Sequence, residues 1–376
     1  MSNKLQLYNL PVLSFFSGGG FLDMGFASAG FDIVWTNEID QVFSGFYREG
    51  ITAWKQKKGI LKKGIECAIS SKNSIKDIQS EIILKEAFKE KPSPFGIIGG
   101  PPCQDFSVNG NLNGFKGDRG SLTDAYLYKV RELQPVFFVM ENVTGLIKVQ
   151  KNAKHFFELL KVMKDDFLID WEVLNSLDFG VPQSRERIFV VGINKSKLNV
   201  SFFENKSSWF PFGKYATHSG AQALYKWPEP NTFGTTPAQP SDIPITLCVE
   251  SCLVNEDQEG VIANAKEYFK LHGDKRRLRS IKEGETNRPS FKRLHRYKYS
   301  PTACYGNNEV HLHPYQHRRL SVREALRIQG VDDSYVITTP GFLSKKFKMI
   351  GNGVPVPMAE ALGMSVRDFI KELPLK

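Results

Sequence analysis

A single thiol stands in a loop that the sequence places at the end of a strand. The apolar run 95–98 is followed by Gly99 and Gly100 and then by Pro101-Pro102-Cys103-Gln104. A short apolar run bounded by glycine and proline is typical of a buried strand that ends in a sharp loop. Open α/β sheets bind ligands at the carboxyl ends of their strands. Cys103 is therefore a candidate nucleophile, although a cysteine by itself is more often a small buried hydrophobe.

A carboxylate and two guanidinium groups could complete this chemistry. The apolar run 136–140 ends at Glu141, so a second strand would deliver an acid to the same edge of the sheet. Arg185 and Arg187 alternate just before the apolar run 188–193, and they could orient a carboxylate or a base through paired hydrogen bonds. The plainer alternatives are that Glu141 caps a helix and that both arginines face solvent.

A glycine turn near the start of the chain could hold a nucleotide. Ser17-Gly18-Gly19-Gly20 separates a strand predicted over 12–16 from a helix predicted over 22–29. Small residues let the backbone approach a nucleotide at a helix N-terminus. The turn does not match G-x-G-x-x-G, so a dinucleotide fingerprint is not supported. Glu38 follows the next predicted strand and could bind ribose hydroxyls, while an ordinary tight turn is the alternative.

Strands alternate with helices over residues 1–200, which predicts an α/β fold with a doubly wound, mostly parallel sheet. Residues 50–76 are rich in lysine and weakly periodic, which predicts a surface insertion. Beyond those already named, the pattern predicts a strand over 33–36 and helices over 81–89, 119–133 and 153–163.

The composition changes after residue 200. Residues 201–245 contain tryptophans and many prolines without periodicity, and residues 274–298 are strongly basic. Helical spacing returns over 321–329 and 357–370. We therefore expect one domain over 1–200, a smaller, irregular domain over 201–318, and a return to the first domain over 319–376.

Charge and cysteine usage restrict the class of protein. The chain has 376 residues, a net charge of +10 and a pI near 9.2, which favours a polyanionic partner. Its 5 scattered cysteines predict reduced thiols in a cytoplasmic protein rather than a disulfide framework. We expect no membrane segment, because no apolar stretch is long enough to span a bilayer. Cys248 and Cys252 could join histidines further along the chain, His311, His313 and His317, at a zinc ion. No second cysteine pair completes the set, so we predict no metal.

Taken in order, these segments resemble the DNA cytosine-5 methyltransferase family, and the compact chain resembles its bacterial modification enzymes. The resemblance covers residues 11–193 and about 300–370, whereas the part near 201–300 lies where this family keeps its variable recognition domain. Three departures stand out: Ser14 replaces an acidic residue, Phe21 a glycine, and Gly353 a serine. The matching segments are Phe16-Ser17-Gly18, Glu38, Asp77, Gly100 to Gln104, Asp118-Arg119-Gly120, Glu141-Asn142-Val143, Gln183-x-Arg185-x-Arg187, Arg319-Leu320-Ser321-x-Arg323-Glu324 and Gly351-Asn352.

The resemblance implies that the domain over 1–200 is the catalytic and cofactor-binding domain and the domain over 201–318 the target-recognition domain. It also implies transfer of a methyl group from S-adenosylmethionine to carbon 5 of a flipped-out cytosine in duplex DNA. Cys103 would add to carbon 6, Glu141 would protonate nitrogen 3, and Arg185 and Arg187 would support the thiolate and the base. The implied cofactor-binding residues are Phe16, Gly18, Glu38, Ile39, Asp77, Ile78, Gly100, Pro102, Leu122, Asn352 and Val354. The candidate DNA-binding residues are Gln104, Ser107, Arg276, Arg277, Arg279, Lys292, Arg293 and Arg296, although the basic stretch could equally be a solvated surface.

The resemblance also implies partners. We expect a monomer that acts on a specific sequence of double-stranded DNA, with a possible cognate restriction endonuclease for the same site. One alternative is a tRNA cytosine-5 methyltransferase of the same fold, which should have a much smaller recognition segment. Another is a catalytically inactive, DNA-binding regulator, against which the intact set of reaction residues speaks.

Overall fold

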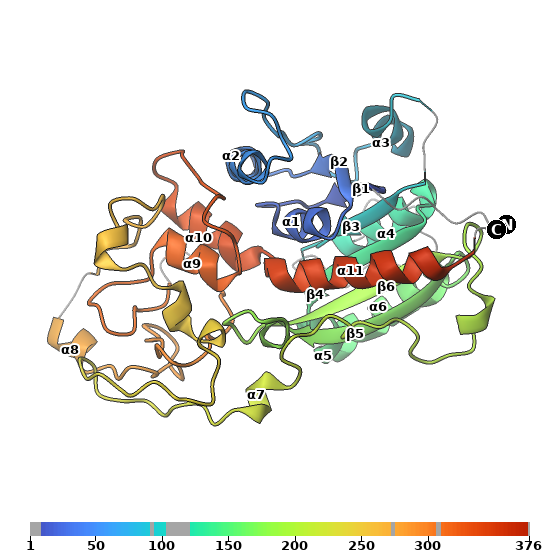
Figure 1. Cartoon of the computed structure of the whole chain (residues 1–376). Helices are drawn as coiled ribbons and strands as arrows, with labels where there is room; N and C mark the ends of the chain where they lie inside the picture. Colours follow the sequence, from blue (N-terminus) through green and yellow to red (C-terminus); the bar gives the residue numbers. More distant parts are fainter. Residues whose placement is uncertain (1–8, 91–93, 103–120, 272–274, 306–309, 375–376) are drawn as a thin grey trace.

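The computed structural model of the chain describes residues 9–90, 94–102, 121–271, 275–305 and 310–374, and within these ranges six strands form one sheet (Figure 1). The strand order is β2-β1-β3-β4-β6-β5. The first four pair in parallel, whereas β6 runs antiparallel to both of its neighbours. The sheet is therefore mostly parallel, as the sequence predicted. The strands are β1 (Pro11–Phe15), β2 (Asp32–Asn37), β3 (Gly96–Gly99), β4 (Phe137–Val143), β5 (Phe167–Asn175) and β6 (Glu186–Asn194).

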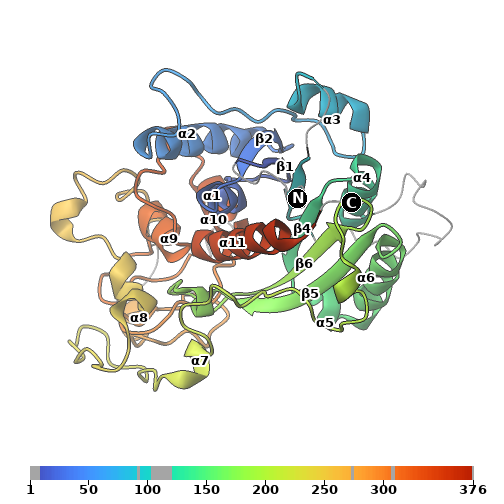
Figure 2. The same ribbon diagram turned by 45° about the vertical axis from the view of Figure 1, so that its right-hand side comes forward.

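Helices cover both faces of this sheet (Figures 1 and 2). Successive side chains of a strand point to opposite faces, and on β4 Phe137 and Val139 join the core beneath α1 and α11. Phe138 and Met140 join the core beneath α3, α4 and α6. The prediction of a doubly wound sheet is thus confirmed. The helices concerned are α1 (Phe21–Ser28), α3 (Ser80–Ala87), α4 (Leu122–Leu133), α6 (Gln150–Met163) and α11 (Val356–Glu372), and the short α5 (Gly145–Lys148) precedes α6.

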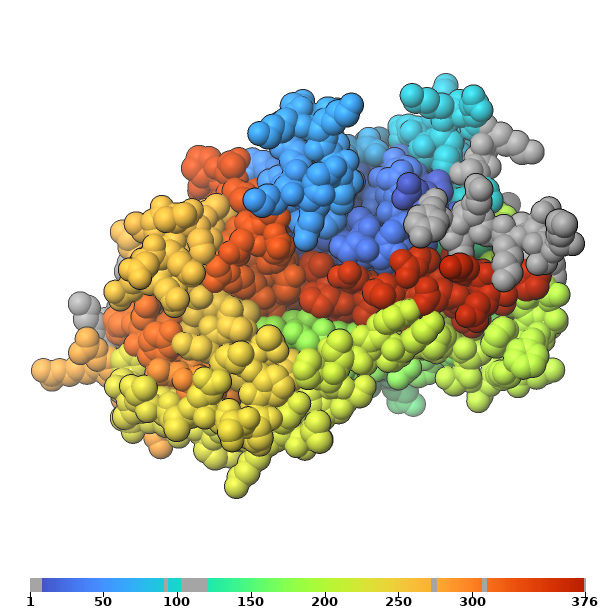
Figure 3. Space-filling model, in the orientation of Figure 1, coloured from blue at the N-terminus to red at the C-terminus, as the bar shows by residue number. Residues whose placement is uncertain are grey.

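The C-terminal part of the chain packs back onto its beginning. α11 lies against α1 so closely that a Cβ on Gly25 would stand 2.4 Å from the Cβ of Ala359. In Figure 3, α11 (red) runs along one face between the blue N-terminal helices and the yellow-green chain that follows the sheet. A second core joins α2 (Gln41–Lys57), α9 (Val322–Ile328) and α10 (Leu343–Asn352). Residues from both ends of the sequence can therefore line one site.

The chain between the sheet and α9 forms a lobe with little regular structure, which we call the recognition lobe (Figure 1). Its α-helices, among the described residues, are the short α7 (Ala221–Leu224) and α8 (Lys275–Arg279). Trp209 and Phe210 still pack on Phe369 of α11, so the sheet core extends beyond residue 200. The division into a recognition domain over 201–318 and a C-terminal return over 319–376 stays a prediction.

One sequence-based prediction was partly wrong, and one strand was missed. Residues 50–57 do not belong to a surface insertion, because α2 continues to Lys57 and buries Ile51 and Trp54 against the second core, whereas residues 58–66 are mostly exposed. The lysines lie near the exposed end of α2, where they obscure the helical spacing of its apolar residues. The edge strand β5 was not predicted, because Asp170 and Glu172 interrupt its apolar run.

Candidate active site

The carboxyl ends of the four parallel strands meet at a cavity of about 330 Å³. This volume lies at the lower end of the range for sites that bind small molecules and cofactors. Segments that are distant in the sequence line it together: the turn after β1, the end of β2, the loop after β3, Glu141 on β4, and the end of α10. The lining residues are Phe16 to Gly19, Phe21, Leu22, Asn37 to Ile39, Phe43, Asn73 to Ile75, Gly100, Pro102, Leu122, Glu141, Met349 and Asn352 to Val354.

The glycine turn after β1 is held in a restricted conformation. Phe16 has a φ of 56°, which is uncommon for a residue with a side chain and tends to occur at functional sites. Gly20 has a φ of 83° and immediately precedes α1. The backbone N–H of Gly18 donates to Glu38 Oε2 at 2.9 Å, and that of Asp40 donates to Oε1 at 2.8 Å. Burial raises the pKa of Glu38, although these two hydrogen bonds oppose the shift.

Glu141 and Arg187 form a buried ion pair beside the cavity. Arg187 Nε lies 2.9 Å from Glu141 Oε1, and the two side chains are 11% and 10% exposed. Arg187 on β6 pairs with Val143 on the antiparallel strand β4. Glu141 lies two residues before Val143 on β4, so Glu141 and Arg187 project from the same face of the sheet. Burial raises the pKa of Glu141, whereas the charges of Arg187 and Arg185 lower it. The raised pKa favours the protonated form of the carboxyl group, which a general acid requires.

Arg185 has a different environment from Arg187. Its guanidinium group donates to the carbonyl of Gly351 at 2.8 Å and to that of Ala303 at 3.3 Å. Burial, followed by the charge of Arg187, lowers the pKa of Arg185 to about 9. Gln183 accepts from the backbone N–H of Ala303 at 2.9 Å. These contacts join the recognition lobe, the strand β6 and the cofactor-side end of α10, so Arg185 positions segments rather than facing open solvent.

The loop that carries the candidate nucleophile starts at the same cavity. Asn142, next to Glu141, donates from Nδ2 to the carbonyl of Pro101 at 3.0 Å. Pro102 lines the cavity. A Cβ on Gly100 would stand 2.9 Å from Glu141 Oε2, so a side chain at position 100 would displace the carboxyl group of Glu141. Cys103 itself, with Gln104 and Ser107, lies outside the described residues.

Two of the departures from the family pattern form one packing unit. A Cβ on Gly353 would stand 2.2 Å from Cδ2 of Phe21. The aromatic ring at position 21 therefore occupies the space that a side chain at 353 would need. At the third departure, Ser14 donates to Oδ1 of the buried Asp23 at 2.6 Å, and Tyr47 donates to Oδ2 at 2.9 Å. Burial raises the pKa of Asp23 to about 6, against these hydrogen bonds.

Nine of the eleven predicted cofactor-binding residues line the cavity, and Asp77 and Ile78 do not. The backbone N–H of Asp77 closes a turn onto Ser74, and its side chain is exposed. Ile78 is buried in the core under α3 and α4. The chain instead presents the run from Asn73 to Ile75 to the cavity, together with Phe43 and Met349, which sequence reasoning missed. A bridge between Ser71 and Asn37, at the end of β2, places the run from Asn73 to Ile75 at the cavity. No spacing in the sequence reveals this pairing.

The predicted DNA-binding residues divide into two groups. Arg276, Arg277 and Arg279 lie on α8, exposed at the left end of the lobe in Figure 1, and Lys292 is half-buried. Arg293 is fully buried and donates to the carbonyls of Ile281, Leu278 and His313. Arg296 is buried against Glu283, with Nε 2.8 Å from Oε1. Both side chains are buried and donate to internal partners, which speaks against the prediction that Arg293 and Arg296 contact DNA.

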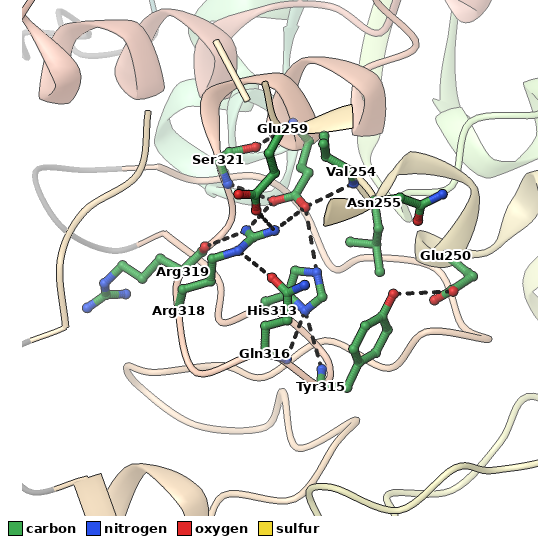
Figure 4. A network of polar contacts seen from close by, with 12 residues as sticks. Glu250, Val254, Asn255, Glu259, His313, Tyr315, Gln316, Arg318, Arg319 and Ser321 are labelled. Carbon is green, nitrogen blue, oxygen red and sulfur yellow. Dashed lines mark hydrogen bonds and ion pairs between the residues drawn. The ribbon is translucent and has the colours of Figure 1, made fainter. Parts of the chain in front are cut away.

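A buried polar network fastens the recognition lobe to α9 (Figure 4). Arg318 donates from both terminal nitrogens to Glu324, at 2.7 Å and 2.8 Å. Glu324 also accepts from the backbone N–H of Val254 at 3.1 Å and of Ser321 at 2.8 Å, where Ser321 caps α9. Burial lowers the pKa of His313 to about 3, so its ring is neutral beside this carboxylate. Buried polar networks of this kind fix the arrangement of the parts that they join.

Comparison with known proteins identifies the class of protein. The sequence profile of the family described as C-5 cytosine-specific DNA methylase matches residues 10–367, and the chain belongs to this family. It is thus a DNA (cytosine-5-)-methyltransferase, which confirms the prediction of an enzyme.

Several relatives match almost the whole chain. The type II methyltransferase M.NmeDI of Neisseria meningitidis serogroup C is 38% identical over 96% of this chain and 84% of its own length. M.FnuDI of Fusobacterium nucleatum, also a type II methyltransferase, is 30% identical over 96% of each chain. A solved putative DNA modification methyltransferase from an E. coli prophage is 26% identical, covers 97% of this chain and 100% of its own, and has a TM-score of 0.63. The S. pombe Dnmt2 structure, 15% identical over 95% of this chain and 98% of its own, has a TM-score of 0.59 and shows the fold alone.

Two further findings concern the described residues only. Their helices are all too short or too polar to cross a membrane. No group of three or more histidine, cysteine, aspartate or glutamate side chains among them could hold a metal ion. Cys248 and Cys252 are instead buried free thiols, and burial raises the pKa of each to about 12.

Proposed function

We propose that this enzyme methylates carbon 5 of a cytosine within a specific sequence of double-stranded DNA, with S-adenosylmethionine as the methyl donor. The observation that carries the proposal is the convergence of three features on one cavity. These are a nucleotide-type glycine turn with Glu38, the buried pair of Glu141 and Arg187, and the start of the loop that bears Cys103. Family membership alone would not say which residues act.

The cavity suits S-adenosylmethionine in its chemistry. Apolar side chains such as Phe16, Ile39 and Leu122 offer surfaces for a purine, and the half-buried carboxylate of Glu38 offers acceptors for ribose hydroxyls. A Cβ on Gly19 would strike Sδ of Met349 at 2.7 Å, so the turn leaves no room for larger residues between α10 and the site. When bound, the cofactor would supply an activated methyl group.

The reaction then depends on residues of this chain. The thiolate of Cys103 adds to carbon 6 of the cytosine, which makes carbon 5 enamine-like and nucleophilic. Glu141 donates its proton to nitrogen 3 as negative charge develops there, and Arg187 holds the carboxyl group in place. After carbon 5 has gained the methyl group, it loses its proton to a base and the thiolate is eliminated. As the thiolate leaves, nitrogen 3 returns its proton to Glu141 and the ring regains its aromaticity. Cys103 and Glu141 are then ready for another turnover.

Access to the thiol requires that the target base leave the duplex. A stacked cytosine cannot reach a site buried at the edge of a sheet, so the enzyme flips the base outward. The recognition lobe would hold the DNA during this step. The exposed arginines of α8 would bind phosphates, and phosphate contacts fix position rather than sequence.

The relatives suggest a biological setting. Those that match over most of their length are named type II methyltransferases, and we propose that this chain is likewise the modification enzyme of a restriction–modification system. A cognate endonuclease would then cut the same sequence when it is unmethylated. We propose further that the enzyme acts as a monomer in the cytoplasm.

Incubation with labelled S-adenosylmethionine and either duplex DNA or tRNA tests the proposed function. We expect label in DNA alone, and bisulfite sequencing of a plasmid from expressing cells should place it at one cytosine of one short sequence. The Cys103→Ser variant should bind the cofactor and transfer no methyl group. Label in tRNA, or DNA binding without methylation, would contradict the proposal.

A further inference from the structure

A second cavity lies where the recognition lobe meets the sheet. Its volume is about 360 Å³, and it is lined by Ser184, Gln222, Gly284, Thr286, His295, Lys298, Tyr299, Pro301 and Thr302. Ser184 immediately precedes Arg185, so the cavity begins three residues before the Arg187 that pairs with Glu141. It is separate from the first cavity and shares no lining residue with it.

The backbone around this cavity is rigidly joined to the catalytic part. The N–H of Ser184 donates to the carbonyl of Ser300 at 2.9 Å, and the N–H of Ser300 donates to that of Pro182 at 2.9 Å. The hydroxyl of Thr302 donates to the carbonyl of Ser184 at 2.9 Å. Trp227 packs edge-on against Tyr299, with ring centroids 4.8 Å apart. A group bound here is therefore held at a fixed place relative to the reaction residues.

The lining offers hydrogen-bond donors and no carboxylate among the described residues. Lys298 has no acidic partner within the described ranges. His295 is 3% exposed, and its Nδ1 accepts from the N–H of Tyr297 at 3.0 Å, so a neutral ring carries its proton on Nε2. Gln222 uses Oε1 to accept from Asn175 and Ser184, which leaves its amide NH₂ as a donor.

Such a lining fits a ligand that presents acceptors. In duplex DNA, the major-groove edge of guanine presents two adjacent acceptors, O6 and N7, and lysine is among the residues that commonly bind them. A phosphate also presents acceptors. Lysine binds phosphates as well as base edges, but phosphate contacts do not depend on sequence. A cavity held at a fixed place relative to the reaction residues suits a base at a set position of the target, and the test below separates the two ligands.

We propose that this cavity reads a guanine of the DNA target, with Lys298 as the donor to O6 and N7. The inference rests on the proposed function, since it names a sequence-reading element of the same reaction. Lys298 is then a specificity-determining residue of the recognition lobe. It lies outside the group of arginines on α8, which would bind DNA of any sequence.

The test uses the full-length enzyme and duplexes that carry its methylated sequence. Each guanine of that sequence is replaced in turn by 7-deazaguanine, which removes N7, and kcat/KM is measured for wild type and for Lys298→Met. We expect one position where the analogue lowers the wild-type value about tenfold, as the loss of a base-specific hydrogen bond should. Lys298→Met should lower kcat/KM on the natural duplex. For this variant, kcat/KM on the duplex with 7-deazaguanine at that position should be no lower than on the natural duplex.

The matched control is Lys226→Met, which removes an exposed lysine of the same lobe that does not line the cavity. It should behave as wild type on every duplex. Thermal stability and cofactor binding of Lys298→Met should also match wild type, since a half-exposed side chain is changed. Thr286→Val gives a second change in the lining, and it should alter kcat/KM for DNA without altering cofactor binding.

Three results would overturn the inference. If Lys298→Met lowers kcat/KM equally on all duplexes and weakens the dependence on salt, Lys298 binds a phosphate. If Lys298→Met has the same kcat/KM as wild type on every duplex, the cavity does not read DNA. If wild type methylates no duplex at all, the proposed function fails first and this inference fails with it.

Discussion

Replacing Arg187 by methionine should expose the electrostatic cost of the buried carboxyl group of Glu141. The two side chains are about one-tenth exposed and lie 2.9 Å apart. Removing one partner of a buried ion pair costs about 3–5 kcal/mol, since it leaves the other charge buried alone. We therefore expect Arg187→Met to lower the free energy of unfolding by that amount at neutral pH, in urea denaturation.

The chain provides a matched control at the same end of β6. Lys148 lies 3.0 Å from Glu186, with side chains 64% and 49% exposed. Exposed pairs contribute about 0–1 kcal/mol, so Lys148→Met should change stability little. Adding Glu141→Gln to Arg187→Met removes the unpaired charge and should recover most of the loss, which gives a large coupling free energy in the double-mutant cycle.

The loss should also depend on pH with a defined sign. Burial already raises the pKa of Glu141, and without Arg187 the pKa rises further, because the largest opposing charge is gone. A carboxyl group with a raised pKa in the folded state destabilises the fold once it ionises. The penalty in Arg187→Met should therefore be small below the ordinary pKa of 4.5 and grow as pH rises through the folded-state value.

The reasoning would be refuted if Arg187→Met resembled Lys148→Met in stability at every pH. It would also fail if the Glu141→Gln change gave no recovery in the double variant.

Further predictions concern the cofactor cavity and the recognition lobe. Gly353→Ser should weaken the binding of S-adenosylmethionine in calorimetry by crowding Phe21, and Phe21→Gly in the same protein should restore it; an unchanged Kd in the single variant would contradict the packing argument. Glu38→Gln should raise that Kd about tenfold, as charge-assisted hydrogen bonds are lost, and an unaltered Kd would remove Glu38 from the ribose role. Arg293→Met should lower stability by about 3 kcal/mol or more because several buried carbonyls lose their donor. Arg277→Met, at an exposed position of α8, should leave stability unchanged and flatten the salt dependence of DNA binding. The reverse pattern would contradict both placements.

The sequence predicted the site correctly where a strand pattern leads directly into a residue that can do chemistry. Apolar runs that end in Gly100-Pro101 or in Glu141 predicted parallel strands with functional carboxyl ends, and the structure brings both ends to one cavity. The return of the C-terminal chain to this cavity followed from the resemblance rather than from any spacing, and Asn352 lies there.

The misses have physical causes that no single-sequence pattern contains. Asp77 has the residue type that a nucleotide site needs, but a turn at Ser74 sends its side chain to solvent and presents Asn73 to the cavity. Arg293 and Arg296 stand in a basic run, yet tertiary folding buries both against carbonyls and Glu283. Charge counts predict that a segment is basic, and only the fold decides which of its charges remain available.

The central claim is that Cys103 forms a transient covalent bond with carbon 6 of the target cytosine. The most direct measurement uses a duplex in which 5-fluorocytosine replaces that cytosine, together with S-adenosylmethionine, because fluorine at carbon 5 cannot leave as a proton does. We predict a stable protein–DNA complex whose mass includes the methyl group and whose peptide map places the bond on Cys103. Absence of a trapped complex on a duplex that the enzyme otherwise methylates, or trapping at another side chain, would contradict the account.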